Sequence, residues 1–485
     1  MAGQQVMEQQ NPTAKTVIDR LREAAHCALN TAQHPHCGWI VTASFQRAVS
    51  RERLRQLAGA DPEDSERMYW ALPGASAAYL ALGRALVITG AGSGRVEGLR
   101  RQMDAYAIHS ADAADVRQAA ADVRWFGGMS FAPKRPSQMW EGWPEAKFVL
   151  PHIVVEWQGQ DTARVVATVA IHTADELETQ LEGVRRELRW LERGAAASGI
   201  HGRKEPVPPC RPMAEAAWCA QVSSSAAEIR SGQYEKVVLA RYEAVHGIHR
   251  PLADVLAELE GKYPDSQVFA VWHSGQCFLG ASPERLVSVS GETVDVDCLA
   301  GTEARGRTAD EDEHLAAQLL ESAKNRLEHE VVRAWIVEQL QTADVLDLTW
   351  PPTPQVKRLA NVQHLHTPIR GRRREQQSVL DLVDELHPTP AVAGRPREKA
   401  LAVIAERESL ERGWYAGPVG WMNGRGEGQF AVALRSALVR GDTAYVFAGA
   451  GIMGDSNPAL EWEETWMKMR AVRTALLPLE GRYSP

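Results

Sequence analysis

The stretch 321–335, ESAKNRLEHEVVRAW, is the starting point because it predicts one long helix with two different sides. The apolar stripe of this helix consists of Leu320, Leu327, Val331 and Val332. The other side carries Glu321, Lys324, Asn325 and Glu328. A buried helix does not need so many charges within two turns, and a solvated helix does not need the stripe. The polar side therefore faces either water or a polar cavity.

The composition is that of a globular chain without a preference for nucleic acid. With 485 residues and 44% hydrophobic content, the chain can bury a sizeable core in one large unit or in two to three domains. The net charge of -8 argues against binding to nucleic acid or to an anionic membrane. We expect no membrane span and no signal peptide, because long apolar runs are missing and the N-terminus is polar. The six cysteines form no CxxC pair, which predicts reduced thiols in a cytoplasmic protein.

The order of the predicted elements favours an α+β fold. Residues 1–14 are rich in Gln and are predicted to be a disordered tail. Residues 197–213 mix Gly, Pro and charge, so we place a boundary here between an N-terminal half, 15–205, and a catalytic region, 206–485. Strands and helices alternate irregularly with hairpin signals between them. We find no P-loop and no GxGxxG that leads from a strand into a helix, which argues against ATP or dinucleotide chemistry.

The last predicted helix, which begins near Ala459, carries a second group of acids. Asn457 can cap this helix and Pro458 suits its first turn. Glu461 and Glu464 lie on one face, and Lys468 follows four residues after Glu464. One interpretation is a surface helix with an ordinary ion pair. The other is a Mg²⁺ site shared with the polar side of the helix at 321–335, because Mg²⁺ prefers one or two carboxylates with water and an anionic substrate.

Further polar residues have two interpretations each. The glycine-rich segment 448–451 could bind a carboxylate through free backbone N–H groups, and Arg435 could either hold a carboxylate or cap a surface strand. Lys236 lies in an apolar strand and could point to water from its edge. Glu284 follows Ser282 and Pro283, where it could simply favour a helix start. The residue patterns alone do not choose between these alternatives.

Ten motifs resemble one family in order and spacing. They are YEKVVLAR, FLGASPERL, LAGT, SAKNRLEHE, VQHLHT, HPTPAVAG, YAGPVGW, FAVALRSALV, AGAGI and EWEETWMK, all within 214–485. The chain resembles the chorismate-utilising enzymes, which include isochorismate synthase, salicylate synthase and the large chains of anthranilate and aminodeoxychorismate synthases. This resemblance implies two orthogonally packed antiparallel sheets, covered by helices on both outer faces in an anthranilate-synthase-like α/β/β/α arrangement. The active site would lie between the sheets.

The resemblance also implies roles for individual residues. Glu328 and Glu464 would bind Mg²⁺ directly, while Glu461 and Asn325 would reach the metal through water. The metal would hold the ring carboxylate of chorismate. The expected holders of the enolpyruvyl carboxylate are Tyr415, Arg435, Lys468 and the amides near Gly449. The residues expected against the substrate are Gly301, Thr302 and His364.

The resemblance favours isochorismate synthase as the activity. Lys236 would be the base that takes a proton from water as it attacks C2 of chorismate, and Glu284 would protonate the departing C4 hydroxyl. Salicylate synthase, which goes on to eliminate pyruvate, is the alternative, but its members tend to carry a hydroxyl residue where Ala391 stands. A non-catalytic chorismate-binding homologue would need neither the acid nor the base. The product would serve menaquinone or catechol-siderophore biosynthesis, in a monomer or weak homodimer without an amidotransferase subunit.

Overall fold

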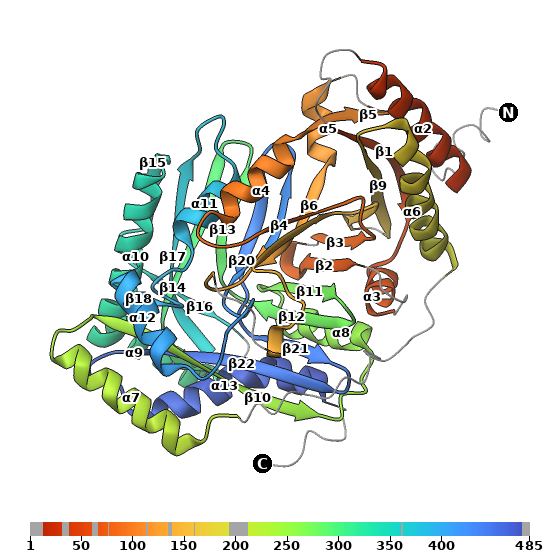
Figure 1. The fold of residues 1–485 in the computed structure, drawn as a ribbon. Helices are drawn as coiled ribbons and strands as arrows, with labels where there is room; N and C mark the ends of the chain where they lie inside the picture. Colours follow the sequence, from red (N-terminus) through yellow and green to blue (C-terminus); the bar gives the residue numbers. More distant parts are fainter. Residues whose placement is uncertain are drawn as a thin grey trace.

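The computed structural model contains two large β-sheets with helices outside them (Figure 1). The residues that the structure describes are 13–31, 38–60, 66–75, 77–112, 115–133, 138–159, 161–193, 212–359 and 362–477. The predicted tail therefore lies outside this part except for Thr13 and Ala14, which cap and begin the first helix. Most of the predicted boundary at 197–213 also lies outside the described residues.

The larger sheet has twelve strands, and its order alternates between early and late parts of the chain. From one edge to the other, its strands are β18 (Gly394–Arg395), β10 (Lys236–His246), β22 (Thr443–Ile452), β21 (Ser436–Arg440), β12 (Gln276–Ser282), β11 (Gln267–His273), β2 (Arg67–Leu72), β3 (Ala77–Leu82), β8 (Ile153–Trp157), β9 (Thr162–Ile171), β1 (Gly38–Ala48) and β5 (Tyr106–Ser110). The pair β1–β5 is parallel, and the other strand pairs among the described residues are antiparallel.

The second sheet has ten strands and carries the remaining hairpins. Its strands are β15 (Leu346–Thr349), β17 (Val362–Arg372), β14 (Thr293–Ala304), β13 (Arg285–Ser290), β20 (Gly428–Val432), β19 (Pro418–Asn423), β6 (Arg124–Met129), β7 (Ala146–Leu150) and β4 (Leu86–Gly90), with β16 (Gln355–Arg358) paired to β17. Early strands join late ones here too, because β6 pairs with β19 just as β2 pairs with β11 in the first sheet.

Helices pack on the outside of each sheet. The twelve-stranded sheet is covered by α2 (Ala14–Leu29), α3 (Arg51–Gly59), α6 (Ala174–Arg193), α7 (Glu215–Arg230), α8 (Leu252–Lys262) and α13 (Pro458–Leu476). The other sheet is covered by α4 (Arg95–Asp104), α9 (Ala309–Glu321), α10 (Ala323–Thr342) and α11 (Val379–Leu386). Two more helices, α5 (Val116–Asp122) and α12 (Arg397–Arg407), pack on β5 and on β10. Figure 1 shows α9 and α10 at the left and α2 and α6 together at the right, so the predicted α+β fold is confirmed.

The alternation of side chains along the strands separates an inner core from an outer one. In β11, Phe269 and Val271 pack into the core between the sheets. The neighbouring residues Val268 and Ala270 pack into the core beneath the outer helices. Both clusters are almost fully buried, which is the pattern expected of a strand covered on both faces.

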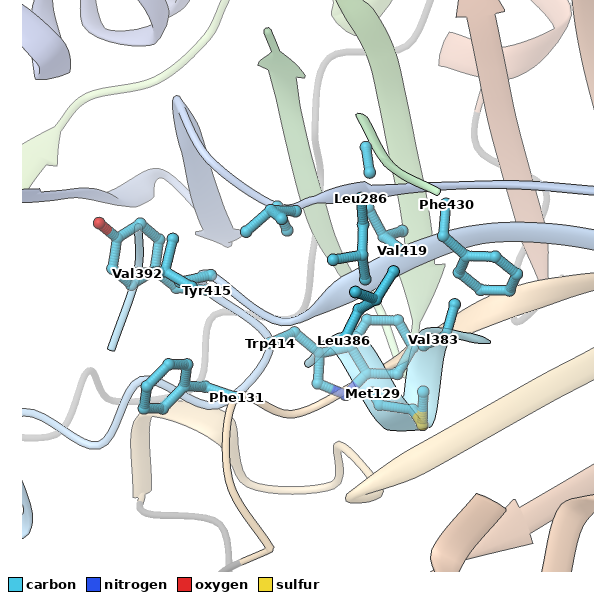
Figure 2. Close-up of a cluster of buried hydrophobic side chains, with 14 of the residues drawn as sticks. Met129, Phe131, Leu286, Val383, Leu386, Val392, Trp414, Tyr415, Val419 and Phe430 are labelled. Atoms are coloured by element: carbon cyan, nitrogen blue, oxygen red, sulfur yellow. The ribbon is translucent and has the colours of Figure 1, made fainter. Parts of the chain in front are cut away.

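Figure 2 shows part of the inner core beside α11. Val383 and Leu386 of this helix lie near Trp414 in one cluster. The labelled residues that complete the view are Met129, Phe131, Leu286, Val392, Val419 and Phe430. Tyr415 stands at the edge of the cluster, and its hydroxyl points away from Trp414. The core therefore supports the backbone at 414–415, and the Tyr415 hydroxyl lies outside the apolar cluster.

The predicted single helix at 321–335 is wrong at its start. Helix α9 ends at Glu321, and α10 begins after Ser322, whose extended ψ of 111° breaks the helix and whose side chain caps the next one. The predicted stripe is confirmed at Val332, which is 1% exposed, but it is wrong at Leu320 and Leu327, which are 39% and 59% exposed. The side of α10 that packs on the sheet instead carries His329, Val332, Trp335, Ile336, Val337 and Leu340.

Two expectations about the chain's chemistry can be compared with the described residues. In this part of the chain, Cys27, Cys219, Cys277 and Cys298 are free thiols, whereas Cys37 and Cys210 lie outside it. None of the helices described is both long enough and apolar enough to cross a membrane.

We expect Trp140→Ala to destabilise the whole molecule in one step. Trp140 is fully buried, and its ring lies 5.3 Å from Phe278 and 5.8 Å from Phe447, so it joins the N-terminal half to two later strands. Truncating such an indole lowers the free energy of unfolding by about 3–5 kcal/mol. Urea unfolding followed by circular dichroism measures this change. The exposed Leu327→Ala is the control, with an expected change within about 0.5 kcal/mol. Two separate unfolding steps, or an unchanged midpoint for Trp140→Ala, would contradict this expectation.

Candidate active site

All the residues that the sequence analysis singled out for a site line one cavity of about 440 Å³. They are Lys236, Glu284, Gly301, Thr302, Asn325, Glu328, His364, Tyr415, Arg435, Gly449, Glu461, Glu464 and Lys468. The volume is within the range of small-molecule sites, about 300–1,000 Å³. Strands of both sheets and the helices α10 and α13 contribute to its wall. The fold therefore brings these residues together, while their individual roles stay predictions.

Lys236 and Glu328 form a buried ion pair across the cavity. The Lys236 Nζ lies 2.7 Å from Glu328 Oε1, and the two side chains are 2% and 17% exposed. Burial opposes ionisation of Glu328, but the hydrogen bond and charge of Lys236, together with the charges of Lys468 and Lys324, lower the pKa of the Glu328 carboxyl. Gly451 leaves room for this pair, because a Cβ there would lie 3.1 Å from Lys236 Cε and 3.2 Å from Glu328 Oε1. The interpretation of Lys236 as a strand-edge lysine in water is wrong.

Glu284 is a buried carboxyl in the turn between β12 and β13. Its backbone N–H donates to Ser282 Oγ at 3.3 Å, and its carbonyl accepts from the Val432 N–H at 3.1 Å. Strand β13 begins at the next residue, so the alternative of a helix start here is wrong. Burial raises the pKa of Glu284 to about 7, although Lys236 opposes the shift. Glu284 can therefore hold a proton near neutral pH and give it up above that range.

The acids of α13 line the cavity wall, and Asn457 caps the helix with Pro458 in its first turn, as predicted. The predicted ion pair on this helix is also present, since Lys468 Nζ lies 2.5 Å from Glu464 Oε1. Glu461 is 5% exposed, and burial and the charge of Glu464 raise the pKa of Glu461 to about 7. The pair of acids therefore carries negative charge that a cation would stabilise.

These carboxylates fit Mg²⁺ by their chemistry. Glu328 of α10 and Glu464 of α13 offer hard oxygen ligands from two helices, and Glu461 lies in the same wall. Within the described ranges, three His, Cys, Asp or Glu side chains do not come together in the geometry of a closed metal site. Lysine ammonium groups pair with both Glu328 and Glu464 instead. Mg²⁺ would need only two carboxylates, with water and substrate in its other positions.

His364, Thr302 and Gly301 form the part of the wall contributed by β14 and β17. The His364 Nδ1 lies 3.0 Å from Thr302 Oγ1 and 3.4 Å from the Gly301 carbonyl. Burial lowers the pKa of His364 to about 3, so the imidazole is neutral. Gly301 has φ +79°, and a Cβ there would lie 3.1 Å from Asn325 Cβ, so this strand irregularity needs glycine. Asn325 donates to Ser322 Oγ at 3.1 Å, which places its amide beside the helix break.

A cluster of donors lines another part of the cavity. Tyr415 stacks on Phe447 at 5.1 Å, and burial raises the pKa of Tyr415 to about 12, so its hydroxyl keeps its proton. Arg435 lies in the connection between β20 and β21 at φ +48° and lines the cavity, which argues against a capping role at the surface. Lys468 donates to the Gly449 carbonyl at 3.0 Å. These donors suit an anionic substrate.

The glycine-rich segment 448–451, predicted to offer backbone N–H groups to a carboxylate, is part of a strand. It lies inside β22 and pairs with β10 from Ala448 to Gly451. The neighbour on the other side, β21, pairs with β22 only as far as Val446. Ala448, Gly449 and Gly451 line the cavity, so this edge of the strand remains available to a ligand.

The sequence analysis missed one buried pair beside the cavity, of which Arg412 lines the wall. Arg412 and Glu408 are only 3% and 2% exposed, and Arg412 also donates to the Val392 and Val238 carbonyls at 2.8 Å each. Glu408 accepts from the Ala240 N–H at 2.7 Å. A Glu and an Arg four residues apart usually indicate an exposed helix face, so spacing gave no signal for this pair. Its contacts hold β10, and with it Lys236, against the loop that precedes β18.

The comparisons agree with the geometry. The family of chorismate binding enzymes matches residues 27–477. A salicylate biosynthesis isochorismate synthase of Pseudomonas aeruginosa is 37% identical, covering 96% of each chain. The isochorismate synthase MenF of Bacillus subtilis is 34% identical over 86% of this chain and 89% of its own. Among solved structures, the menaquinone-specific isochorismate synthase MenF of Escherichia coli superposes with a TM-score of 0.74 at 26% identity, covering 94% of this chain and 100% of that one. The chain therefore belongs to the chorismate binding enzymes.

Proposed function

We propose that the protein is a Mg²⁺-dependent isochorismate synthase. The observation that carries this proposal is that Lys236 and Glu284, a candidate base and a candidate acid, line the same cavity as the Glu328 and Glu464 carboxylates. The names of the relatives from Pseudomonas aeruginosa and Bacillus subtilis support the same activity. Chorismate and isochorismate are isomers, so the reaction adds one hydroxyl and removes another without a further reactant.

Lys236 takes the proton of the water that attacks C2 of chorismate. A lysine accepts a proton only as the neutral amine, and the Lys236 Nζ lies 2.7 Å from Glu328 Oε1. The proposed base therefore acts as the deprotonated amine. Its position at the start of β10, 1% exposed, keeps bulk solvent from the amine and so supports this role.

Glu284 gives a proton to the C4 hydroxyl, which then leaves as water while the ring double bonds shift. Its pKa of about 7 supports this role, because a carboxylic acid with an ordinary pKa would be ionised at neutral pH. The proton that Lys236 gains and the proton that Glu284 loses balance over the reaction. Exchange with solvent then restores both groups.

The remaining donors orient the substrate. Arg435, Tyr415 and Lys468 would bind the enolpyruvyl carboxylate, and neutral His364 would lie against the ring with Thr302. Glu328 and Glu464 would hold Mg²⁺, with Glu461 and Asn325 reaching it through water. The ion supplies positive charge to the ring carboxylate and to the transition state.

Salicylate formation is the alternative outcome for the same site. It requires the cavity to promote loss of pyruvate after isochorismate has formed. Ala391 lines the cavity, and this apolar side chain offers no hydroxyl at the position where salicylate synthases tend to carry one. This observation favours isochorismate as the released product.

The released product tests the proposed activity directly. The purified protein incubated with chorismate and Mg²⁺ should yield isochorismate as the main product, measured by HPLC. Lys236→Met should lower turnover by about 10²–10⁴-fold, the usual loss for a general base. The exposed Lys399→Met is a control that should keep full turnover. Salicylate and pyruvate as dominant products would overturn the proposed isochorismate synthase activity. Full turnover by Lys236→Met would overturn the base role of Lys236.

The pH dependence tests the acid. Glu284 is protonated below about pH 7 and ionised above it, so kcat/KM should fall on the basic side of about pH 7. Each further pH unit should lower the rate by about tenfold, because only the protonated fraction reacts. Glu284→Gln, which cannot give a proton, should lose turnover at every pH. A Glu284→Gln enzyme with the wild-type profile would exclude the acid role.

Mg²⁺ binding can be tested without turnover. A ligand that binds only the folded state at a hundred times its Kd stabilises it by about 2.7 kcal/mol, so Mg²⁺ should raise the Tm of the wild-type protein. Glu464→Gln should remove most of this rise, whereas Glu338→Gln, an exposed change on α10, should keep it. Calorimetry with and without Mg²⁺ measures the effect. An equal rise in wild type and Glu464→Gln would place the ion elsewhere.

A further inference from the structure

Three polar side chains of the second sheet form a network next to the Glu284 turn. Arg285, the residue after Glu284, donates to Asp297 Oδ1 at 3.0 Å from β13 to β14. The His366 Nε2 of β17 lies 3.0 Å from the same oxygen. Asp297 is 8% exposed, so its carboxylate is held between these two partners away from solvent. The mechanism described above does not use this network.

Asp297 lies on the side of β14 that faces the cavity. Side chains two apart on a strand share a face, and Leu299, two residues after Asp297, lines the cavity. Cys298, the residue between them, points to the other face, where its thiol contacts His329 of α10. The Asp297 carboxylate therefore lies on the same side of the sheet as the site that contains Glu284.

Charged groups act on Glu284 from every element around it. Lys236 of β10, Arg435 and Lys468 of α13 each favour its ionised form. The Asp297 carboxylate of β14 has the opposite effect. Its negative charge and the burial of Glu284 both favour the protonated form of Glu284. Lys357 of β16 also lies near, since it donates to the Pro283 carbonyl at 3.4 Å. Lys236, Arg435 and Lys468 thus draw the proton away from Glu284, and Asp297 opposes them.

We propose that Asp297 is a positioning residue for the reaction: its buried negative charge, fixed by Arg285 and His366, keeps the proton on Glu284 among the surrounding cations. This inference rests on the proposed acid role of Glu284 and deepens it. Arg285 and His366 have a second effect, because they keep Asp297 itself ionised. Burial alone would favour its neutral form, but the His366 hydrogen bond and the Arg285 charge lower the pKa of Asp297 to about 2.

The network makes two variants a matched pair. Asp297→Asn and Arg285→Gln break the same ion pair, so both cause similar structural damage. They change the charge near Glu284 in opposite directions. Losing the carboxylate should move the basic limb of kcat/KM to lower pH by about one unit, the usual size of a nearby-charge effect. Without the Arg285 guanidinium, the Asp297 charge is less compensated. The basic limb of kcat/KM should then move to higher pH.

Glu284 can also be titrated without turnover. In each background, the infrared difference between the protein and the same protein carrying Glu284→Gln isolates the carboxyl band of Glu284. This band disappears as Glu284 ionises. We expect the midpoint of this titration to move down in Asp297→Asn and up in Arg285→Gln. Should Asp297→Asn fail to fold by circular dichroism, the upward shift in Arg285→Gln decides the question alone. A merely structural network would lower turnover in both variants and leave both midpoints in place.

The outcomes separate the inference from the proposed function. An unchanged midpoint, or a shift of both variants in the same direction, would overturn the role of Asp297. Full turnover by Glu284→Gln would overturn the acid role instead, while the infrared titration would still report on Asp297. Opposite shifts together with an inactive Glu284→Gln would support both.

Discussion

The Lys236–Glu328 ion pair is the constraint on which the site depends. A buried charge without a partner is costly, so the first residue of β10 and the second turn of α10 must stay within contact of each other. This contact spans the two sheets, because β10 belongs to one and α10 covers the other. Gly451 of β22 completes the arrangement, since a side chain there would press on both partners. Both partners line the cavity between the layers.

The same cavity keeps two buried carboxyls in opposite protonation states. Glu328 has an ammonium partner and stays ionised, whereas Glu284 is buried beside Asp297 and keeps a proton up to about pH 7. Environments that separate the pKa values of two acids in this way are typical of sites in which one group acts as an acid and another as a base. The proposed metal ligand and the proposed proton donor are therefore distinguished by their neighbours, although both are glutamates.

Local signals in the sequence predicted the elements well and the long-range pairs poorly. Asn457 and Pro458 mark the start of α13 because capping is a local interaction. The break at Ser322 was missed because a single extended residue hardly changes a helical pattern, and counting across it gave the wrong apolar side. Nothing in the spacing of Lys236 and Glu328 predicts their contact, which depends on how the sheets pack. The resemblance to known enzymes placed both residues in one active site but did not predict their ion pair. It had no equivalent for Arg412 and Glu408, whose spacing suggests a solvated helix.

The N-terminal half has a physical reason to remain with the catalytic region. Strand β11 would be an open edge of its sheet without β2, and β19 would be an open edge of the other without β6. Unpaired strand edges bind other chains and favour aggregation. The early strands cover both edges and extend each sheet beyond the site. Trp140 and Trp143 of this half add aromatic contacts to Phe278 of β12. The N-terminal half and the catalytic region therefore share one hydrophobic core.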